Sequence, residues 1–354
     1  MAERRRLPDL PTEPGPEFAE FLRKSAQIHD VKLAALIPRE LFEPRLARGL
    51  LGFAVSATLY AGAVVGVAFV PHWSLYLPLW LVAGLGGWGL HSIAHDCGHG
   101  AFSRSRRLNT VIGQIALLPL CYPFHAWRHI HNLHHAHTNH LELDTDWRPI
   151  PAETYDRMPR HRRVLYRALR SWAVFGGTVN YWASSAFRPG FFPKRSMRRD
   201  VGSSILVVLA VLVPYLTSLT YFTGFAGLLR YFAAPWLVSF AWFSVATFMQ
   251  HTARDIPFLP ARHWTPNAGR LLVTTDYRYP RWLLFLTHNN SLHTAHHVAP
   301  IVPFYNLPRA RAALDAAYPG MIRERRPGIR ALWDVLRHCR YYDPKSGFYL
   351  TAAR

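Results

Sequence analysis

The chain has 354 residues, with 41 Lys and Arg against 21 Asp and Glu, so its formal net charge at pH 7 is +20. Half of the residues are hydrophobic, which excludes a disordered basic tail, and three cysteines are too few for a disulfide-rich secreted domain. Charge alone leaves two classes, a soluble nucleic-acid-binding protein and a membrane protein with basic loops.

The first 48 residues are expected to form a cytoplasmic N-terminal arm. Residues 1–16 are rich in Arg, Pro and Glu, which predicts disorder. Apolar residues recur at roughly helical spacing over Glu17–Leu41. This second pattern predicts an amphipathic helix that lies on the membrane surface.

Four windows of 19 to 23 residues contain no charged side chain: Gly49–Val70, Leu75–Ala94, Val201–Thr223 and Tyr231–Met249. At about 1.5 Å per residue, each can cross a hydrocarbon core of about 30 Å. Four such runs are hard to place in the core of a soluble protein, and short connections join them into two helical hairpins. Of the basic residues, only Arg230 lies in a connection, so the positive-inside rule places both termini and the central loop in the cytoplasm. This topology explains the net charge without nucleic acid.

Two further stretches are expected at the membrane interface. Leu108–Cys121 is apolar but too short to span, which predicts a re-entrant or interfacial helix. Arg163–Phe187 mixes arginine with aromatic residues and is a second interfacial candidate. The sequence thus predicts an all-α membrane protein with four transmembrane helices in two hairpins and a cytoplasmic helical cap. We expect the membrane domain to cover residues 49–318 and a cytoplasmic tail to cover residues 319–354.

Histidine provides the clearest functional signal. Eight of the 20 histidines fall into three clusters, HDCGH, HNLHH and HTAHH: His95, His99, His131, His134, His135, His293, His296 and His297. Residues three or four apart share one face of a helix, so each cluster is expected to direct its imidazoles into one small volume. The predicted topology places all three clusters on one side of the membrane.

Imidazole is a ligand suited to Fe, Zn, Cu and Ni. Because a structural zinc site uses about four ligands, eight histidines imply two metal ions. Two imidazole-bound metals at the mouth of a helical bundle indicate oxygen chemistry on a lipid-like substrate, although spacing alone does not separate iron from another metal. A metal transporter is disfavoured because it would carry ionisable residues within its spans.

The chain resembles the membrane fatty acid desaturases of the histidine-box superfamily, in particular the Δ12/ω-6-type acyl desaturases. The resemblance covers roughly residues 49–318. It rests on four segments in the family's order: AHDCGHGAFSRSRRLNTVIGQ (94–114), WRHIHNLHHAHTN (127–139), DTDW (144–147) and HTAHHVAPIVPFYNL (293–307).

This resemblance implies a non-haem diiron centre, a buried acyl tunnel, O₂ as co-substrate and two electrons from a separate protein. The eight clustered histidines become iron ligands. His251, just past the last span, matches a ninth ligand, with a capping or surface role as the alternative. Asn289 matches a water-mediated ligand or, alternatively, a helix N-cap. Carboxylates that could hold the other ring nitrogens are Asp96, Glu142, Asp144 and Asp146. Cys97 is expected to serve packing only.

The predicted reaction is the O₂-dependent introduction of a double bond into an acyl chain. Alternatives with the same metals are a hydroxylase or ketolase and an acetylenase acting on a lipid. No haem-binding His-Pro-Gly-Gly motif of a fused cytochrome b5 is present in the chain, so the electron donor is expected to be a separate ferredoxin or cytochrome b5. The substrate could be an acyl-lipid, an acyl-CoA or an acyl-carrier-protein thioester. The expected location is a bacterial inner membrane or an endoplasmic reticulum membrane.

Overall fold

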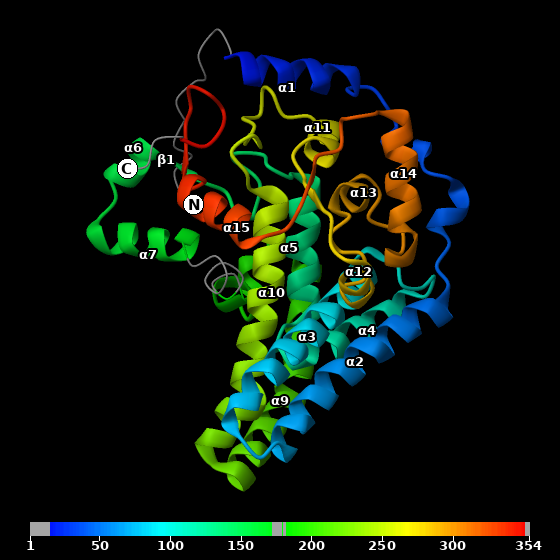
Figure 1. Cartoon of the computed structure of the whole chain (residues 1–354), viewed down its shortest axis with the longest axis vertical. Helices are drawn as coiled ribbons and strands as arrows, with labels where there is room; N and C mark the ends of the chain where they lie inside the picture. Colours follow the sequence, from blue (N-terminus) through cyan, green and yellow to red (C-terminus); the bar gives the residue numbers. More distant parts are fainter. Residues whose placement is uncertain (1–14, 172–178, 180–181, 351–354) are drawn as a thin grey trace.

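The computed structural model describes residues 15–171, 179 and 182–350, and this part of the chain is mostly helical, as predicted (Figure 1). Long helices form a bundle at one end of the molecule: α2 (Leu46–Phe69), α3 (Tyr76–His99), α9 (Arg195–Leu228) and α10 (Ala234–His251). The disorder expected over residues 1–16 falls almost wholly outside the described residues.

The other end of the molecule is a short-helix region. Its helices are α1 (Pro16–Gln27), α4 (Arg106–Leu117), α5 (Phe124–Ala136), α6 (Ala152–Asp156), α7 (Arg160–Ser171), α11 (Pro266–Leu271), α12 (Arg281–Leu286), α13 (His293–Val298), α14 (Leu307–Ala317) and α15 (Ile329–His338). Two short parallel strand pairs join distant segments: β1 (Ile150–Pro151) with β4 (Tyr341–Tyr342), and β2 (Asp276–Tyr277) with β3 (Glu324–Arg325).

Three helical segments of the described chain are long and apolar enough to cross a membrane: Leu46–Phe69, Trp73–His99 and Arg195–His251. The third has 57 residues and contains two of the predicted windows. Its helix is interrupted at Gly224 (φ 67°, ψ −176°), a conformation that glycine adopts without steric cost. Both ends of the segment reach α5, because the N–H of His125 donates to Ser204 Oγ (3.2 Å) and His134 Nε2 lies 3.2 Å from His251 Nε2. The segment therefore turns back on itself.

Glycines let the long helices approach closely. A Cβ on Gly86 of α3 would lie 2.5 Å from the backbone nitrogen of Tyr60 in α2, so only a hydrogen fits at this position. The neighbouring glycines Gly84 and Gly87 face side chains of α10 in the same way. Small residues at helix contacts are typical of membrane proteins, in which close packing drives association.

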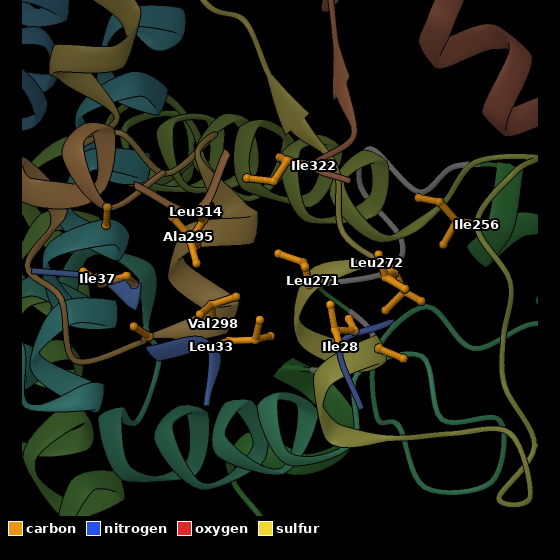
Figure 2. Packing of buried hydrophobic residues seen from close by; sticks show 14 of the residues in the cluster. Ile28, Leu33, Ile37, Ile256, Leu271, Leu272, Ala295, Val298, Leu314 and Ile322 are labelled. Carbon is orange, nitrogen blue, oxygen red and sulfur yellow. The ribbon is translucent and has the colours of Figure 1, made fainter. Parts of the chain in front are cut away.

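The N-terminal helix differs from its prediction. We expected the amphipathic segment within Glu17–Leu41 to lie on the membrane, but its apolar side chains are buried in a hydrophobic cluster of the short-helix region. Figure 2 shows part of this cluster, in which Ile28 and Leu33 lie near Leu271, Leu272 and Val298. The apolar face of this segment is used for packing against α11, α13 and α14.

The expected C-terminal tail packs closely on the rest of the molecule. Strand β4 pairs with β1, and Phe348 belongs to the same hydrophobic cluster as α1 and α13. Cys339 and Tyr349 pack with Phe248 of α10 in a second cluster. Residues 319–350 therefore pack beside α7 and α10.

Candidate metal centre

Nine histidines meet where the long helices join the short-helix region. His95 and His99 end α3, and His251 is the last residue of α10. The others lie on α5 (His131, His134 and His135) and on α13 (His293, His296 and His297). The structure thus brings together all eight clustered histidines and the proposed ninth residue.

Within the described residues, these imidazoles fall into two adjacent groups. The first contains His95, His99, His131, His135 and His296, whose potential ligand atoms all lie within 4.8 Å of one another. The second contains His134, His251 and His297, together with His293, whose Nε2 lies 2.7 Å from His251 Nε2 and 3.0 Å from His297 Nε2. The rings of His135 and His297 stack at 4.1 Å and connect the groups.

Each HxxHH cluster divides between the two groups, which differs from the expectation that each cluster fills one volume. On α5, His131 and His135 belong to the first group and His134 to the second. On α13 the assignment is reversed, because the i,i+4 pair His293 and His297 belongs to the second group. The physical reason is helical geometry: residues four apart share a direction, whereas adjacent residues point about 100° apart.

The contacts within the groups fit a set of metal ligands. His135 Nε2 lies 3.0 Å from both His131 Nε2 and His296 Nε2. One ring nitrogen offers either one proton or one lone pair, so it cannot form two good hydrogen bonds with two other ring nitrogens. The buried Nδ1 atoms of His251 and His293 also have no hydrogen-bond partner among the described residues. Converging imidazole nitrogens of this kind suit borderline transition metals.

Electrostatics keep most of these imidazoles neutral. Burial lowers the pKa of His131, His135, His293, His296 and His297 well below 6.5, and neighbouring histidines lower it further. Neutral imidazole is the form that binds a metal, so these side chains are ready as ligands at pH 7.

His134 is held differently. Burial lowers its pKa, but Asp144 and Asp146 have the larger opposite effect and raise the pKa of His134 to about 9. Its Nδ1 lies 2.7 Å from Asp144 Oδ1, while Asp144 also accepts from the backbone N–H of Asn139 (2.6 Å) and of Asp146 (3.0 Å). This carboxylate fixes the ring orientation and directs Nε2 toward the second group, as in other metal sites.

Buried polar residues also fix α13. Asp276 Oδ1 accepts a hydrogen bond from the N–H of Thr294 (2.8 Å), and Asp276 Oδ2 lies 3.4 Å from Arg311 Nε. Burial raises the pKa of Asp276 to about 6, although these hydrogen bonds oppose the shift. A further bond joins Thr138 Oγ1 to His297 Nδ1 (3.1 Å), so the segment that follows α5 orients a histidine of α13.

A cavity of about 310 Å³ lies beside these histidines. One part of its lining is mainly aromatic and includes Trp88 of α3, Phe243 of α10 and Tyr122 just before α5. A second part, called the outer part below, consists of the loop Thr145–Arg148 and of Tyr166, Leu169 and Arg170 of α7. His95, His131, His134, His251 and His293 also line the cavity. The cavity therefore places apolar side chains beside the candidate metal centre.

Comparison with known proteins agrees with this geometry. The family model described as fatty acid desaturase matches residues 71–327, which is more than half of the chain. The chain belongs to the fatty acid desaturase family. It is an oxidoreductase that introduces a double bond into acyl chains of lipids. The matched range contains all nine histidines of the candidate centre.

Several curated desaturases are similar along most of this chain. The sn-1 oleoyl-lipid 12-desaturase of Synechocystis sp. is 32% identical over 91% of this chain and 92% of its own length. The sn-1 oleoyl-lipid 12-desaturase of Arthrospira platensis is 37% identical over 69% of each chain. The chloroplastic omega-6 fatty acid desaturase of Spinacia oleracea is 31% identical over 89% of this chain and 70% of its own length. The resemblance to Δ12/ω-6-type desaturases is therefore confirmed.

Asn289 donates its amide to the carbonyl of Phe304 (3.1 Å), and its described contacts include no histidine, so its water-mediated role stays a prediction. Of the other histidines near the clusters, His91, His125 and His288 are buried. His288 lies 2.7 Å from Ser56 Oγ of α2, and His91 stacks on Phe243.

The sequence interpretation missed other residues. Thr138 and Asp276 hold α13, and Arg170 lines the cavity, but none of them lies in a histidine cluster. Of the four candidate carboxylates, Asp144 contacts His134 of the centre (2.7 Å), while Asp146 and Asp96 lie 3.9 Å from His134 Nδ1 and His95 Nδ1. Glu142 contacts His140 instead (2.9 Å). The sequence showed only that these carboxylates lie near a histidine cluster. Proximity along the chain does not show which histidine, if any, a polar side chain contacts.

Proposed function

We propose that the nine histidines hold two iron ions. His95, His99, His131, His135 and His296 would bind one ion, and His134, His251, His293 and His297 the other. The convergence of these nitrogens into two groups supports this assignment. When bound, the iron pair supplies, with O₂, the oxidising power needed to remove hydrogen from a methylene group, which has no acidic proton.

The protein's own residues orient the ligands and the substrate. Asp144 keeps the Nδ1 proton on His134, and Thr138 holds His297. Asp276 fixes the first turn of α13 through the N–H of Thr294. The aromatic walls of the cavity exclude water and confine an acyl chain, so that one pair of neighbouring methylenes lies beside the metal centre. Asn289, whose Nδ2 donates to the carbonyl of Phe304, would act on this centre through a water molecule.

The topology we propose has four membrane crossings in two hairpins, with the metal centre and both termini on the cytoplasmic side. A straight helix of 57 residues would be about 85 Å long, nearly three times a hydrocarbon core of about 30 Å. The interruption at Gly224 and the contacts of both segment ends with α5 support two crossings within Arg195–His251. The basic residues outside the spans support the cytoplasmic side.

We propose that the acyl substrate is an oleoyl lipid and that the new double bond forms at carbon 12. The printed names of relatives from Synechocystis sp. and Arthrospira platensis, both sn-1 oleoyl-lipid 12-desaturases, support this assignment. The two electrons would come from a separate acidic ferredoxin or cytochrome b5. The net charge of +20 supports such a partner through long-range attraction.

Expression in a host that lacks polyunsaturated lipids tests this function. Mass spectrometry of the host's fatty acids, with localisation of the double bonds, should reveal a diene with a new bond at carbon 12. A hydroxylated product would favour the hydroxylase alternative, and an acetylenic product the acetylenase alternative.

Histidine variants test the metal centre. His131→Ala and His296→Ala should abolish the product and lower the iron content of the purified protein, which we expect to be two ions per chain. His72→Ala is the matched control, because His72 is exposed in the connection between α2 and α3. Full activity in His131→Ala, or purified active protein without iron, would contradict the assignment.

A further inference from the structure

Arg170 is a buried cation that the desaturase reaction does not require. It lies on α7, lines the outer part of the cavity and is only 4% exposed. Its guanidinium donates to the carbonyls of Trp147 and Cys339 and to Tyr349 Oη. Among the residues that the structure describes, no carboxylate contacts it, so its positive charge is not neutralised by an ion pair. Buried charges without a partner are costly.

The Nε donor of this guanidinium remains free. Arg170 Nε is buried and has no hydrogen-bond partner among the described residues. The rings of Phe248 and Tyr349 lie 5.5 Å and 5.7 Å from its Cζ, so they cover part of the guanidinium surface. An anion can therefore reach Arg170 only where the guanidinium borders the cavity. Guanidinium groups in such positions bind phosphate and carboxylate with directed hydrogen bonds.

A second arginine lies at the rim of the same cavity. Arg148 is exposed and donates to the carbonyls of Glu142 (2.7 Å) and Leu141 (3.4 Å), which are uncharged acceptors. The carboxylates that line this cavity, Asp144 and Asp146, are directed to His134. The outer part of the cavity therefore carries two arginines, and Asp146 of the same loop is directed to His134.

The outward face of α7 indicates where an anionic ligand would come from. Val164 and Leu165 are 61% and 56% exposed, beside the exposed cations Arg160, Arg162 and Arg167. A basic helix that exposes apolar side chains in this way is typical of one lying at an anionic lipid surface. In Figure 1, α7 lies beside the bundle and across the direction of α10. One helix thus connects the lipid surface with the cavity.

We propose that Arg170, with Arg148 at the rim, binds the phosphate of a glycerophospholipid whose acyl chain extends past the metal centre. The inference rests on the proposed function and specifies its substrate class. Substrates whose head group carries no charge would leave the buried guanidinium without an anion. The desaturase therefore prefers phospholipids to uncharged glycolipids with the same acyl chains.

The test uses the purified full-length iron protein in mixed micelles with its electron donor. Dioleoyl-phosphatidylglycerol and the uncharged monogalactosyl-dioleoylglycerol are compared at equal mole fractions. We expect KM to be about tenfold lower for the phospholipid, which corresponds to about 1.4 kcal/mol. Arg170→Gln should raise KM for the phospholipid about tenfold and change KM for the galactolipid by a much smaller factor. Arg170→Lys should restore part of the difference. Arg281→Gln, an exposed residue at the start of α12, is the matched control.

Several results would overturn the inference. One is equal KM values for the two lipids in the unmodified protein. A second is an Arg170→Gln variant that loses activity equally on both lipids, because Arg170 would then only hold the backbone of Trp147 and Cys339. If that variant does not fold, Arg148→Gln decides, since its side chain is exposed and should raise KM for the phospholipid alone.

Other anion sources form separate arms of the test. Preference for oleoyl-CoA over both lipids, or inhibition by millimolar inorganic phosphate that is equal for both lipids, would also contradict a lipid phosphate site. The absence of a new double bond in every substrate would contradict the proposed function itself. Equal turnover of the charged and uncharged lipids would contradict only the phosphate site.

Discussion

Replacement of Asp144 by asparagine should weaken metal binding without disrupting the fold. The side chain is buried and contacts His134 Nδ1 at 2.7 Å, so the change removes one negative charge and keeps the shape. Burial opposes the protonation of His134, yet Asp144, with Asp146, raises its pKa from 6.5 to about 9. Because burial opposes the shift, the attraction of the carboxylates for the protonated ring exceeds the roughly 3 kcal/mol that this net shift represents. The same carboxylate orients the neutral ring toward a metal, and loss of such a partner typically costs 10- to 100-fold in metal affinity, which is the loss we expect for Asp144→Asn.

The assay is a chelator titration of the purified protein, with bound iron measured by mass spectrometry and activity measured in parallel. Asp144→Asn should release iron at 10- to 100-fold lower free chelator concentration than the unmodified protein. Glu142→Gln is the control, because this exposed carboxylate contacts His140, which lies outside both groups. Equal iron retention in Asp144→Asn and the unmodified protein would refute the role of Asp144 in orienting a ligand.

Four further outcomes can be measured. Gly86→Val should lower the melting temperature, because the added side chain clashes with the Tyr60 backbone at a cost of about 1–3 kcal/mol. Gly62→Ala should not lower it, because the added atom meets open space. Equal melting temperatures for the two variants would contradict the close packing of α2 and α3. Because folding raises the pKa of Asp276 from 3.8 to about 6, the folded state binds the proton more tightly, so stability falls as pH rises from about 4 to about 6. In melting experiments from pH 4 to 7, Asp276→Asn should no longer show this fall in stability with rising pH. The same fall of melting temperature with pH in Asp276→Asn and the unmodified protein would contradict the role of Asp276. Removal of iron by chelation should lower the melting temperature by mass action, with reversal on adding Fe²⁺. Electron transfer from an acidic donor should slow markedly between low and high salt in stopped-flow measurements, and salt-independent rates would contradict electrostatic attraction.

The ligand candidates could be predicted from the sequence because helical spacing is a local property. His131 and His135 share a face of α5 wherever that helix lies, and the same holds for His293 and His297 on α13. His251 was identified through the family resemblance. The division into two groups depends on how α3, α5, α10 and α13 pack together, and no local pattern contains that information.

The supporting residues could not be predicted for the same reason. Asp276 contacts Thr294 across 18 positions, and Arg170 contacts the carbonyl of Cys339 across 169 positions. The N-terminal segment shows a different limit. Its apolar periodicity predicted burial of one face, but the pattern is identical for a helix on lipid and for one packed on protein, and Phe18 packs on protein.

The position of the C-terminal segment has a consequence for how the enzyme is made. Arg170, on the cavity wall, is held by the carbonyl of Cys339 and by Tyr349, while β4 pairs with β1 directly after the loop that carries Asp144. A nascent chain whose long helices have already been made still lacks the C-terminal residues that complete the cavity wall. Assembly of the reaction chamber must therefore wait until the residues up to Tyr349 have left the ribosome.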